Sequence, residues 1–249
     1  MAAQPHIVVI DYHKGNLSSV ARGLARAGAE AQIADDPAAI RAADGMVLPG
    51  VGSFYDAIEF MHESGQDQAV LDAVRDGEGV PFLGICLGEQ LLFDCGEEGV
   101  PADAPVCEVS GPRGEGLEPG DVFEENGRRW VRGLGLLGGS CTVLPSRRLK
   151  VPHVGWDQVH VTPAGRACPL LVGFNEGANA YFTHSYAVDD DVDATHVAAQ
   201  THYARNFASV VWRSNVFGCQ FHPEKSSAHG HDILRNFVNI AKAWKEETA

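Results

Sequence analysis

The chain has 249 residues, of which 45% are hydrophobic and 21% charged, which is ordinary for a globular protein and enough for one large α/β domain or two small ones. The formal net charge of −14 argues against a surface that binds nucleic acid or an anionic membrane. No apolar run approaches the roughly 20 residues of a membrane span, and residues 1–12 lack the features of a signal peptide, so we expect a cytoplasmic protein.

The first hundred residues alternate between two patterns. Short apolar runs, typical of buried strands, lie at 6–12, 31–36, 45–50 and 80–86. Amphipathic patterns, typical of helices, lie at 17–25, 54–65, 68–79 and 87–95. Asn16 is placed to cap the first helix, and Gly77 or Gly79 to end the third. This alternation predicts an α/β fold with a doubly wound, mostly parallel sheet.

The periodicity changes after residue 100. Residues 101–132 are rich in proline, glycine and acids, and Asn126-Gly127 within them fits a two-residue type I′ turn. That turn pairs Glu125 with Arg128, Glu124 with Arg129, Phe123 with Trp130 and Val122 with Val131. We therefore expect a surface hairpin insertion at about 101–132.

Short β-like runs dominate from residue 140 to 221, and we expect them to add antiparallel strands to the sheet. The pattern at 232–247 predicts a closing amphipathic helix with Ile233, Leu234, Phe237, Ile240, Ala241 and Trp244 on one face. Since no repeat or linker divides the chain, we expect a single domain, 1–249.

One cysteine lies where a strand pattern meets a helix pattern. Gly84-Ile85-Cys86-Leu87-Gly88 has the form G-x-C-x-G, the cysteine counterpart of the nucleophile elbow. The glycines allow a tight turn at the carboxyl edge of the sheet, and a helix N-terminus favours the reactive thiolate. A buried structural cysteine at a tight turn is the alternative. The other five cysteines form no C-x-x-C pairs, so we predict neither a disulfide scaffold nor a metal site.

A nucleophile needs a base and a group that orients the base. His222 and Glu224 are separated by Pro223, and on a strand they would project to the same side. His222 would take the thiol proton and pass it to a leaving amine, while Glu224 would fix the imidazole tautomer. Taken alone, this pattern is better explained by a solvent-facing turn, but together with the elbow it is a strong indication of a catalytic base.

Glycines also mark the strand end at residues 48–54. Gly50 and Gly52 would let backbone N–H groups approach a developing oxyanion. The alternative is a glycine-rich turn with no ligand.

Together these segments resemble a class I, triad-type glutamine amidotransferase, and more narrowly the glutaminase subunit of imidazole glycerol phosphate synthase. The segments that carry the resemblance are IDYHKGNLSSV, LPGVGSFYDAI, GICLGEQLLF, GLGLLGG, VPHVGWDQV, YFTHSY and QFHPEKSS. They span nearly the whole chain except 101–132. The resemblance implies a flavodoxin-like α/β fold with antiparallel additions to its sheet.

The resemblance also implies roles for individual residues. The expected triad is Cys86 as nucleophile, His222 as general base and acid, and Glu224 as its orienting group. The expected oxyanion strand is Gly50, Val51 and Gly52. The expected glutamine-binding residues are Gln90, Glu98, Ser185 and Tyr186. The residues expected to face a partner and an ammonia passage are Asn16, His153 and Trp156.

The implied reaction is hydrolysis of glutamine through a cysteine thioester, without metal or cofactor. Its ammonia would pass into a (β/α)8-barrel cyclase subunit that makes imidazole glycerol phosphate and AICAR in histidine biosynthesis. The alternatives are a glutaminase of another class I branch, a hydrolase or peptidase on the same fold, and a scaffold subunit without activity.

Glu89 departs from the resemblance, since an apolar residue, often methionine, is usual there. A carboxylate three residues from Cys86 would oppose the thiolate, but we favour an orientation toward solvent or a basic patch of the partner. The acidic, lysine-poor composition is a second open question, because it suits a high-salt cytoplasm and general solubility equally well.

Overall fold

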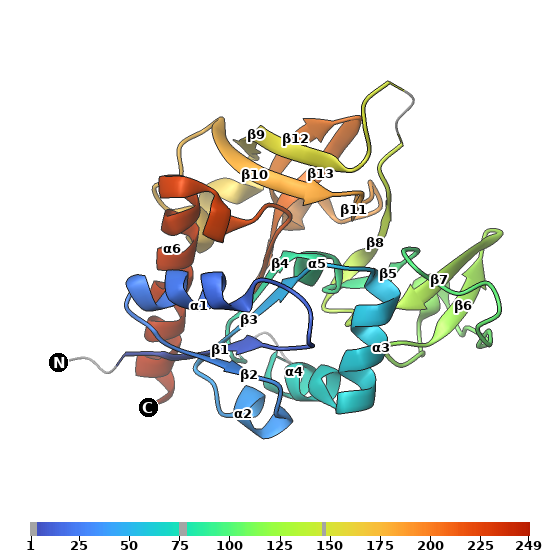
Figure 1. Cartoon of the computed structure of the whole chain (residues 1–249), viewed down its shortest axis with the longest axis horizontal. Coiled ribbons are helices and arrows are strands. Elements are labelled where there is room, and N and C mark those ends of the chain that lie inside the picture. The colour runs from blue at the N-terminus through green and yellow to red at the C-terminus, as the bar shows by residue number, and fades with distance from the viewer. Residues whose placement is uncertain (1–3, 75–78, 146–147) are drawn as a thin grey trace.

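Residues 4–74, 79–145 and 148–249 are described by a computed structural model of the chain (Figure 1). Five parallel strands form one side of a nine-stranded sheet and run in the order β14 (Val216–Cys219), β4 (Phe82–Cys86), β3 (Gly45–Gly50), β1 (His6–Ile10) and β2 (Glu30–Ala34), with β2 at the edge. Four antiparallel strands extend it beyond β14: β13 (Arg205–Arg213), β12 (Val197–Tyr203), β9 (His153–Val161) and β10 (Ala178–His184). The predicted doubly wound sheet with antiparallel additions is confirmed.

Side chains of the central strands alternate between two hydrophobic clusters, one on each face of the sheet. On β1, Ile7 and Val9 pack in the cluster that includes α1 (Leu17–Arg26) and α6 (Ser227–Thr248). Val8 and Ile10 pack in the opposite cluster, with α2 (Pro37–Arg41), α3 (Phe54–Ser64) and α4 (Gln66–Val74). Helices on both faces explain why these strands read as continuous apolar runs rather than alternating ones.

Two details of the predicted helices are wrong. Asn16 occupies the N-cap position of α1, but its side chain makes no capping hydrogen bond. The helix expected over 87–95 is the single turn α5 (Leu87–Gln90), because the buried residues that follow lead into strand β5 (Phe93–Gly96). The predicted role of Gly77 in ending a helix lies outside the described residues.

A second sheet of five strands adjoins the first, and this was not expected. Its order is β11 (Tyr186–Val188), β8 (Leu137–Val143), β5, β7 (Arg128–Arg132) and β6 (Val122–Glu125). Two predictions for residues 140–221 therefore need correction. β8 and β11 belong to this second sheet, and β14 pairs with β4 in parallel rather than antiparallel.

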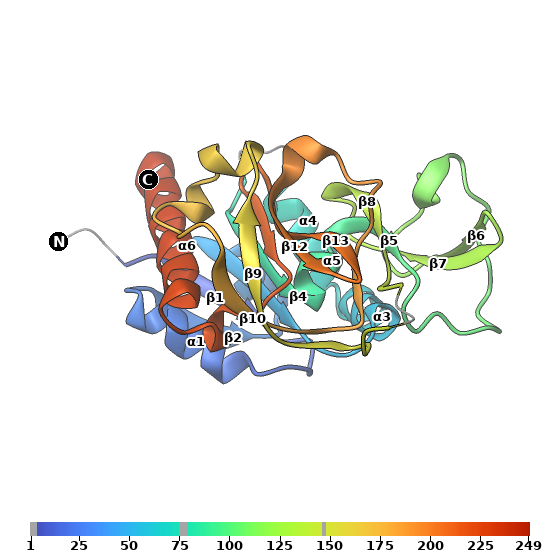
Figure 2. The same ribbon diagram turned by 90° about the horizontal axis from the view of Figure 1, so that it is seen from above.

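The hairpin β6–β7 has the predicted register at all four pairs, from Val122–Val131 to Glu125–Arg128. Asn126 and Gly127 have φ values of 53° and 73°, as a type I′ turn requires. The hairpin lies at the edge of the second sheet and projects to one side of the molecule (Figures 1 and 2).

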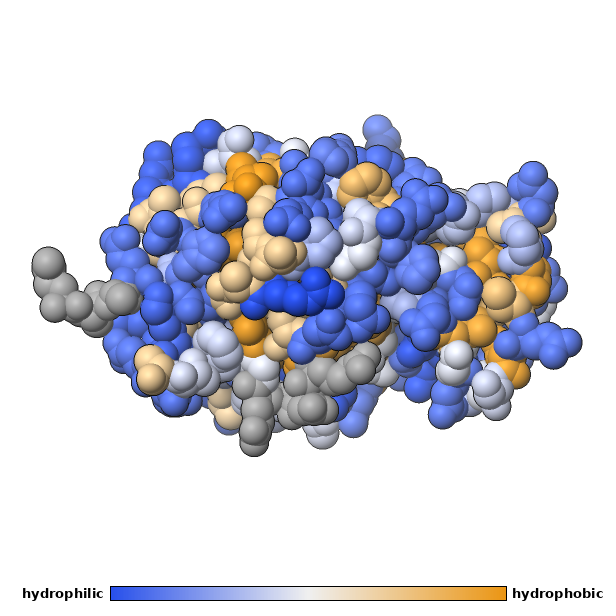
Figure 3. All heavy atoms as spheres, turned by 90° about the horizontal axis from the view of Figure 1, so that it is seen from below, coloured by the Kyte–Doolittle hydropathy of each residue, from blue (hydrophilic) through white to orange (hydrophobic). Residues whose placement is uncertain are grey.

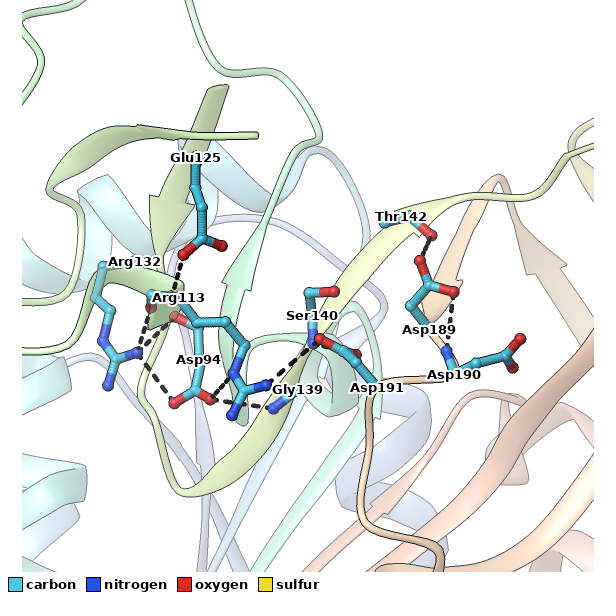
Figure 4. Close-up of polar contacts among 10 residues, drawn as sticks. All are labelled: Asp94, Arg113, Glu125, Arg132, Gly139, Ser140, Thr142, Asp189, Asp190 and Asp191. Atoms are coloured by element: carbon cyan, nitrogen blue, oxygen red, sulfur yellow. Dashed lines mark hydrogen bonds and ion pairs between the residues drawn. The ribbon is translucent and has the colours of Figure 1, made fainter. Parts of the chain in front are cut away.

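Asp94 on β5 joins residues 101–132, which we call the hairpin lobe, to the rest of the second sheet (Figure 4). Its carboxylate accepts hydrogen bonds from Arg113 Nε at 2.9 Å, Arg132 Nη1 at 3.0 Å and the Gly139 backbone N–H at 3.1 Å. A short 3-10 turn, Pro112–Gly114, carries Arg113 to this point. Two guanidinium groups of the hairpin lobe, those of Arg113 and Arg132, therefore bind one half-buried carboxylate.

The remaining 3-10 turns lie in the connections, at Ala164–Ala167, Pro169–Leu171, Ala194–His196 and Pro223–Lys225. Among the described residues no helix is both long and apolar enough to cross a membrane. All six cysteines are unpaired in this structure.

Candidate active site

Cys86 lies at the carboxyl end of β4, where the chain turns into α5. Its φ of 56° and ψ of −109° are an unusual conformation for a residue other than glycine, and such conformations are found mainly at functional sites. A Cβ on Gly84 would collide with the Gly88 carbonyl, and a Cβ on Gly88 would collide with the Leu48 carbonyl. The two glycines are therefore required by close backbone contacts, which hold Cys86 in the elbow.

His222 and Glu224 lie on the connection after β14, with Glu224 in the Pro223–Lys225 turn. They are not on a strand, so the alternation expected from the sequence is not what brings them together. His222 Nδ1 is 3.0 Å from Glu224 Oε1, and both side chains are buried. Because the carboxylate only accepts, Nδ1–H donates to it, which leaves Nε2 for the Cys86 thiol.

The surroundings of His222 favour its protonated form. Burial on its own lowers the pKa of His222, but interaction with Cys86 and Glu224 outweighs it and raises the pKa to about 9. Nε2 has no hydrogen-bond partner among the described residues. At neutral pH the imidazolium therefore holds a proton that it can deliver to a leaving group at Cys86.

The sulfur of Cys86 has two hydrogen-bonding contacts. The Thr183 carbonyl is 3.8 Å from Sγ, and Gln220 Nε2 donates to Sγ at 3.6 Å. Gln220 is fully buried and was not among the predicted site residues. Its place in the segment QFHPEKSS, beside His222, was the available signal.

The strand end at Gly50 lies beside the nucleophile, because Gly50 pairs with Cys86 in the register of β3 and β4. The Val51 N–H donates to the Tyr12 hydroxyl at 3.0 Å, and that hydroxyl donates to the Val51 carbonyl at 3.3 Å. Gly52 has a φ of 112°. The Val51 N–H is thus already bonded in this structure, and the oxyanion role of the strand stays a prediction.

Four residues predicted to bind glutamine meet in one place. A cavity of about 60 Å³ is lined by Gln90, Glu98, Ser185 and Tyr186, together with Cys86 and Gly52. Burial raises the pKa of Glu98 to about 7, although a hydrogen bond from the Phe54 backbone lowers it. The cavity therefore joins the nucleophile to a carboxyl group that ionises near neutral pH and suits a ligand's ammonium group.

The three residues expected at a partner surface lie in different environments. Asn16 and Trp156 are exposed. His153 is buried, stacked on Tyr203 with ring centroids 4.0 Å apart, and its Nδ1 is 3.2 Å from Nε2 of His184. His153 is therefore next to His184, which lines the cavity, rather than at the surface.

Glu89 does not point to solvent or to a partner, and the orientation favoured from the sequence is wrong. Its side chain is fully buried, and neither carboxyl oxygen has a hydrogen-bond partner among the described residues. Burial raises the pKa of Glu89 well above its usual value, and the nearby Cys86 raises it further. Glu89 is therefore neutral, and a neutral acid does not oppose the thiolate.

Comparison with known proteins agrees with this geometry. The family model for class-I glutamine amidotransferases matches residues 8–241. Among curated proteins, imidazole glycerol phosphate synthase subunit HisH of Syntrophotalea carbinolica is 41% identical, covering 94% of this chain and 100% of that protein. The subunit HisH of Halobacterium salinarum is 44% identical, covering 94% of this chain and 92% of that protein.

Among solved structures, a Thermoplasma acidophilum protein described as a GMP synthase subunit has a TM-score of 0.67 at 18% identity. The match covers 99% of this chain and 98% of the Thermoplasma chain. A structure described as glutamine amidotransferase has a TM-score of 0.61 at 17% identity, covering 94% and 98%. Both matches support the fold. The chain therefore belongs to the class-I glutamine amidotransferases, in the branch of the HisH subunits of imidazole glycerol phosphate synthase.

Proposed function

We propose that this protein is a glutaminase that uses Cys86, His222 and Glu224 as its catalytic triad. The observation that carries the proposal is the cavity, in which Cys86 meets four residues of the predicted glutamine pocket. His222 would supply the acid–base chemistry, since Glu224 holds its Nδ1 and no other group of the described residues is hydrogen-bonded to its Nε2. Family membership agrees with this activity.

In the proposed reaction the Cys86 thiolate attacks the side-chain carbonyl carbon of glutamine. The carbonyl π electrons move to oxygen and return as the C–N bond breaks, and His222 gives its Nε2 proton to the leaving nitrogen, so that ammonia departs. The product is a glutamyl thioester on Cys86. His222 then takes a proton from water, the hydroxide attacks the thioester, and glutamate leaves with Cys86 restored as the thiolate.

The relatives' name identifies them as one subunit of imidazole glycerol phosphate synthase, and we propose the same role for this chain. Its partner would be a (β/α)8-barrel cyclase that receives the ammonia directly, in the cytoplasm. Exposed apolar side chains at Val51, Val154 and Trp156, at 42%, 58% and 53%, support an interaction with a partner. Asn16 and the buried His153 are proposed to adjoin the passage.

Glutamate release from glutamine tests the proposal, measured for the chain alone and with the cyclase and its nucleotide substrate. We expect slow turnover alone, strong stimulation in the complex and no turnover by Cys86→Ala. Activity that survives Cys86→Ala would contradict the assigned nucleophile. Activity that ignores the cyclase would favour another branch of the family, and a wild-type complex without glutaminase activity would favour a scaffold.

We also propose that the chain is a single domain in which residues 101–132 are a surface addition. The lobe contributes none of the residues that line the cavity. Variants confined to the exposed side of the lobe, such as Val106→Ser, are expected to keep full glutaminase activity in a folded protein.

A further inference from the structure

Two buried amides lie behind the nucleophile in a continuous row of hydrogen bonds. Gln90 Nε2 donates to the Tyr186 carbonyl at 2.8 Å and to Gln220 Oε1 at 2.9 Å. Gln220 Nε2 in turn donates to Cys86 Sγ at 3.6 Å. The row therefore runs from a backbone carbonyl through two side-chain amides to the sulfur of Cys86.

The direction of this row follows from its first member. A backbone carbonyl can only accept, so Gln90 must turn its NH2 group toward Tyr186. The same NH2 group also donates to Gln220, so the amide oxygen of Gln220 must be the acceptor. That orientation leaves the NH2 group of Gln220 toward Cys86. Although the two ends of a side-chain amide look alike, the hydrogen bonds assign both of them here.

A donor at this position favours the charged form of the nucleophile. A hydrogen bond from an amide N–H is stronger to a thiolate than to a thiol, and burial of both partners keeps water from competing. Gln220 is 0% exposed and Cys86 is 5% exposed. The effect therefore acts in a site that solvent does not screen.

The other titratable groups around Cys86 do little to stabilise its negative charge, with one exception. Burial raises the pKa values of three groups and keeps them neutral: Tyr12, Glu89 and Cys219. The pKa of His184 is lowered to about 3 by burial, so it is neutral as well. The exception is the imidazolium of His222. Glu98 lines the same cavity, and its pKa of about 7 gives it a partial negative charge at neutral pH that opposes the thiolate. His222 therefore favours the thiolate by its charge, and Gln220 favours it by a hydrogen bond.

We propose that Gln220 is a catalytic residue whose amide N–H stabilises the Cys86 thiolate, and that Gln90 is a positioning residue that holds this amide in its donating orientation. Both N–H bonds of Gln90 are used in the row, so Gln90 can offer only its oxygen to a ligand in the cavity. The proposal rests on the proposed glutaminase function where turnover is concerned, but the ionisation of Cys86 can be measured without glutamine.

The test is the pH dependence of Cys86 alkylation by iodoacetamide, followed by mass spectrometry of the Cys86 peptide because Cys107 is also partly accessible. Gln220→Met keeps the length of the side chain and removes the donor. We expect the midpoint of the alkylation profile to rise by about one pH unit, since a hydrogen bond to a charged group is lost. With the cyclase present, kcat/KM for glutamine is expected to fall about tenfold at neutral pH.

Gln66→Met is the matched control. Gln66 is as buried as Gln220, but its amide donates to the Asp11 and Asp35 carbonyls at 2.9 and 3.1 Å, away from Cys86. We expect this variant to lose stability and to keep the wild-type alkylation profile. Gln90→Met is expected to shift the profile in the same direction as Gln220→Met, because the amide of Gln220 loses its orienting donor.

An alkylation profile of folded Gln220→Met that coincides with the wild type would overturn the proposal. If that variant does not fold, the unaltered chain still decides, since the side-chain amide resonance of Gln220 should shift as Cys86 ionises. An amide resonance that ignores Cys86 would also overturn it. A wild-type complex without glutaminase activity would instead contradict the proposed function, and the alkylation result would distinguish the two failures.

Discussion

Glu89 is the residue whose chemistry the sequence left open, and its burial decides the matter. Its folded pKa lies well above the usual value, so the folded protein holds a proton there that the unfolded chain releases above about pH 4.5. The resulting stability is complete below the unfolded pKa and decreases as the pH rises toward the folded pKa. Glu89 therefore makes the protein less stable at neutral pH than at mildly acidic pH.

Gln at this position removes that dependence. We expect the unfolding free energy of Glu89→Gln to increase relative to wild type between about pH 5 and about pH 8, by up to about 1.4 kcal/mol per pH unit, because the wild type alone must keep a proton on residue 89. Urea unfolding at the two pH values measures this. Glu89→Met should gain at least as much, because no polar atom remains buried. Equal pH slopes in wild type and Glu89→Gln would contradict a neutral buried acid.

Glu98 is a second residue with a testable ionisation. Since burial raises its pKa to about 7, the carboxylate that would bind the ammonium group of glutamine forms only near neutral pH. We expect KM for glutamine to be about tenfold higher at pH 6 than at pH 8, following the ionised fraction of a group with that pKa. Glu98→Gln should raise KM and abolish its pH dependence.

The adjacent Glu97 provides the control for that experiment. Its carboxylate accepts from the Val143 N–H at 2.8 Å and does not line the cavity. Glu97→Gln is expected to retain the wild-type pH dependence of KM. If Glu98→Gln also retained it, another group would be responsible.

At the level of elements, the outcome of each prediction depended on the range of its interactions. The hairpin register was predictable because the Asn126-Gly127 turn fixes it locally. The segment 87–95 was misassigned because a short apolar run fits a helix or a strand, and the pairing of β5 with β7 and β8 decides in favour of the strand. That pairing involves residues about 40 positions away, which no local pattern reports.

The Asp94 cluster holds the second sheet and the lobe together, so its loss should be costly. Asp94→Asn would leave Arg113 and Arg132 without their shared carboxylate, and we expect a loss of about 2–4 kcal/mol. Chemical denaturation measures this. Asp56→Asn breaks the exposed Lys14 pair and should cost under about 1 kcal/mol. Similar losses in the two variants would show that the cluster is no stronger than a surface pair.

The candidate site shows the same division. The grouping of Cys86 with Gln90, Glu98, Ser185 and Tyr186 at one cavity was predictable, because these residues lie in short segments that resemble a family; their roles stay a proposal. The contact of Gln220 with Cys86 and the burial of Glu89 could not be predicted, because both depend on how β14 packs against α5. Gly218 of β14, which has no side chain, leaves the space that the Glu89 side chain fills. Packing of this kind involves residues about 130 positions apart in the chain.

At the scale of the whole molecule, the net charge of −14 is the dominant electrostatic feature. The face shown in Figure 3 is mainly hydrophilic, with apolar side chains on the hairpin lobe at the right and in a second group over the left half of the view. Val106 and Val109, in the lobe, are 47% and 39% exposed. Because acidic groups outnumber basic ones, like charges repel each other at low ionic strength.

Salt should therefore stabilise the protein. We expect Tm to rise by about 4 °C as the KCl concentration increases, which corresponds to a gain of about 1–2 kcal/mol in the free energy of unfolding. If screening alone acts, most of the rise should occur below about 0.5 M, because the Debye length falls from about 10 Å at 0.1 M to about 3 Å at 1 M. A rise that continues above about 1 M would favour adaptation to a high-salt cytoplasm, and a fall in Tm would contradict both explanations.

The chain passes from the first sheet to the second twice, and both passages lie at the cavity. β4 ends at Cys86 and continues through α5 into β5, while β10 ends at His184 and continues through Ser185 into β11. The cavity therefore lies where the two sheets are joined, and both connections contribute residues to its lining. A change in the position of one sheet relative to the other would move the ends of the two strands that carry Cys86 and His184, so the shape of the pocket depends on how the sheets are held together.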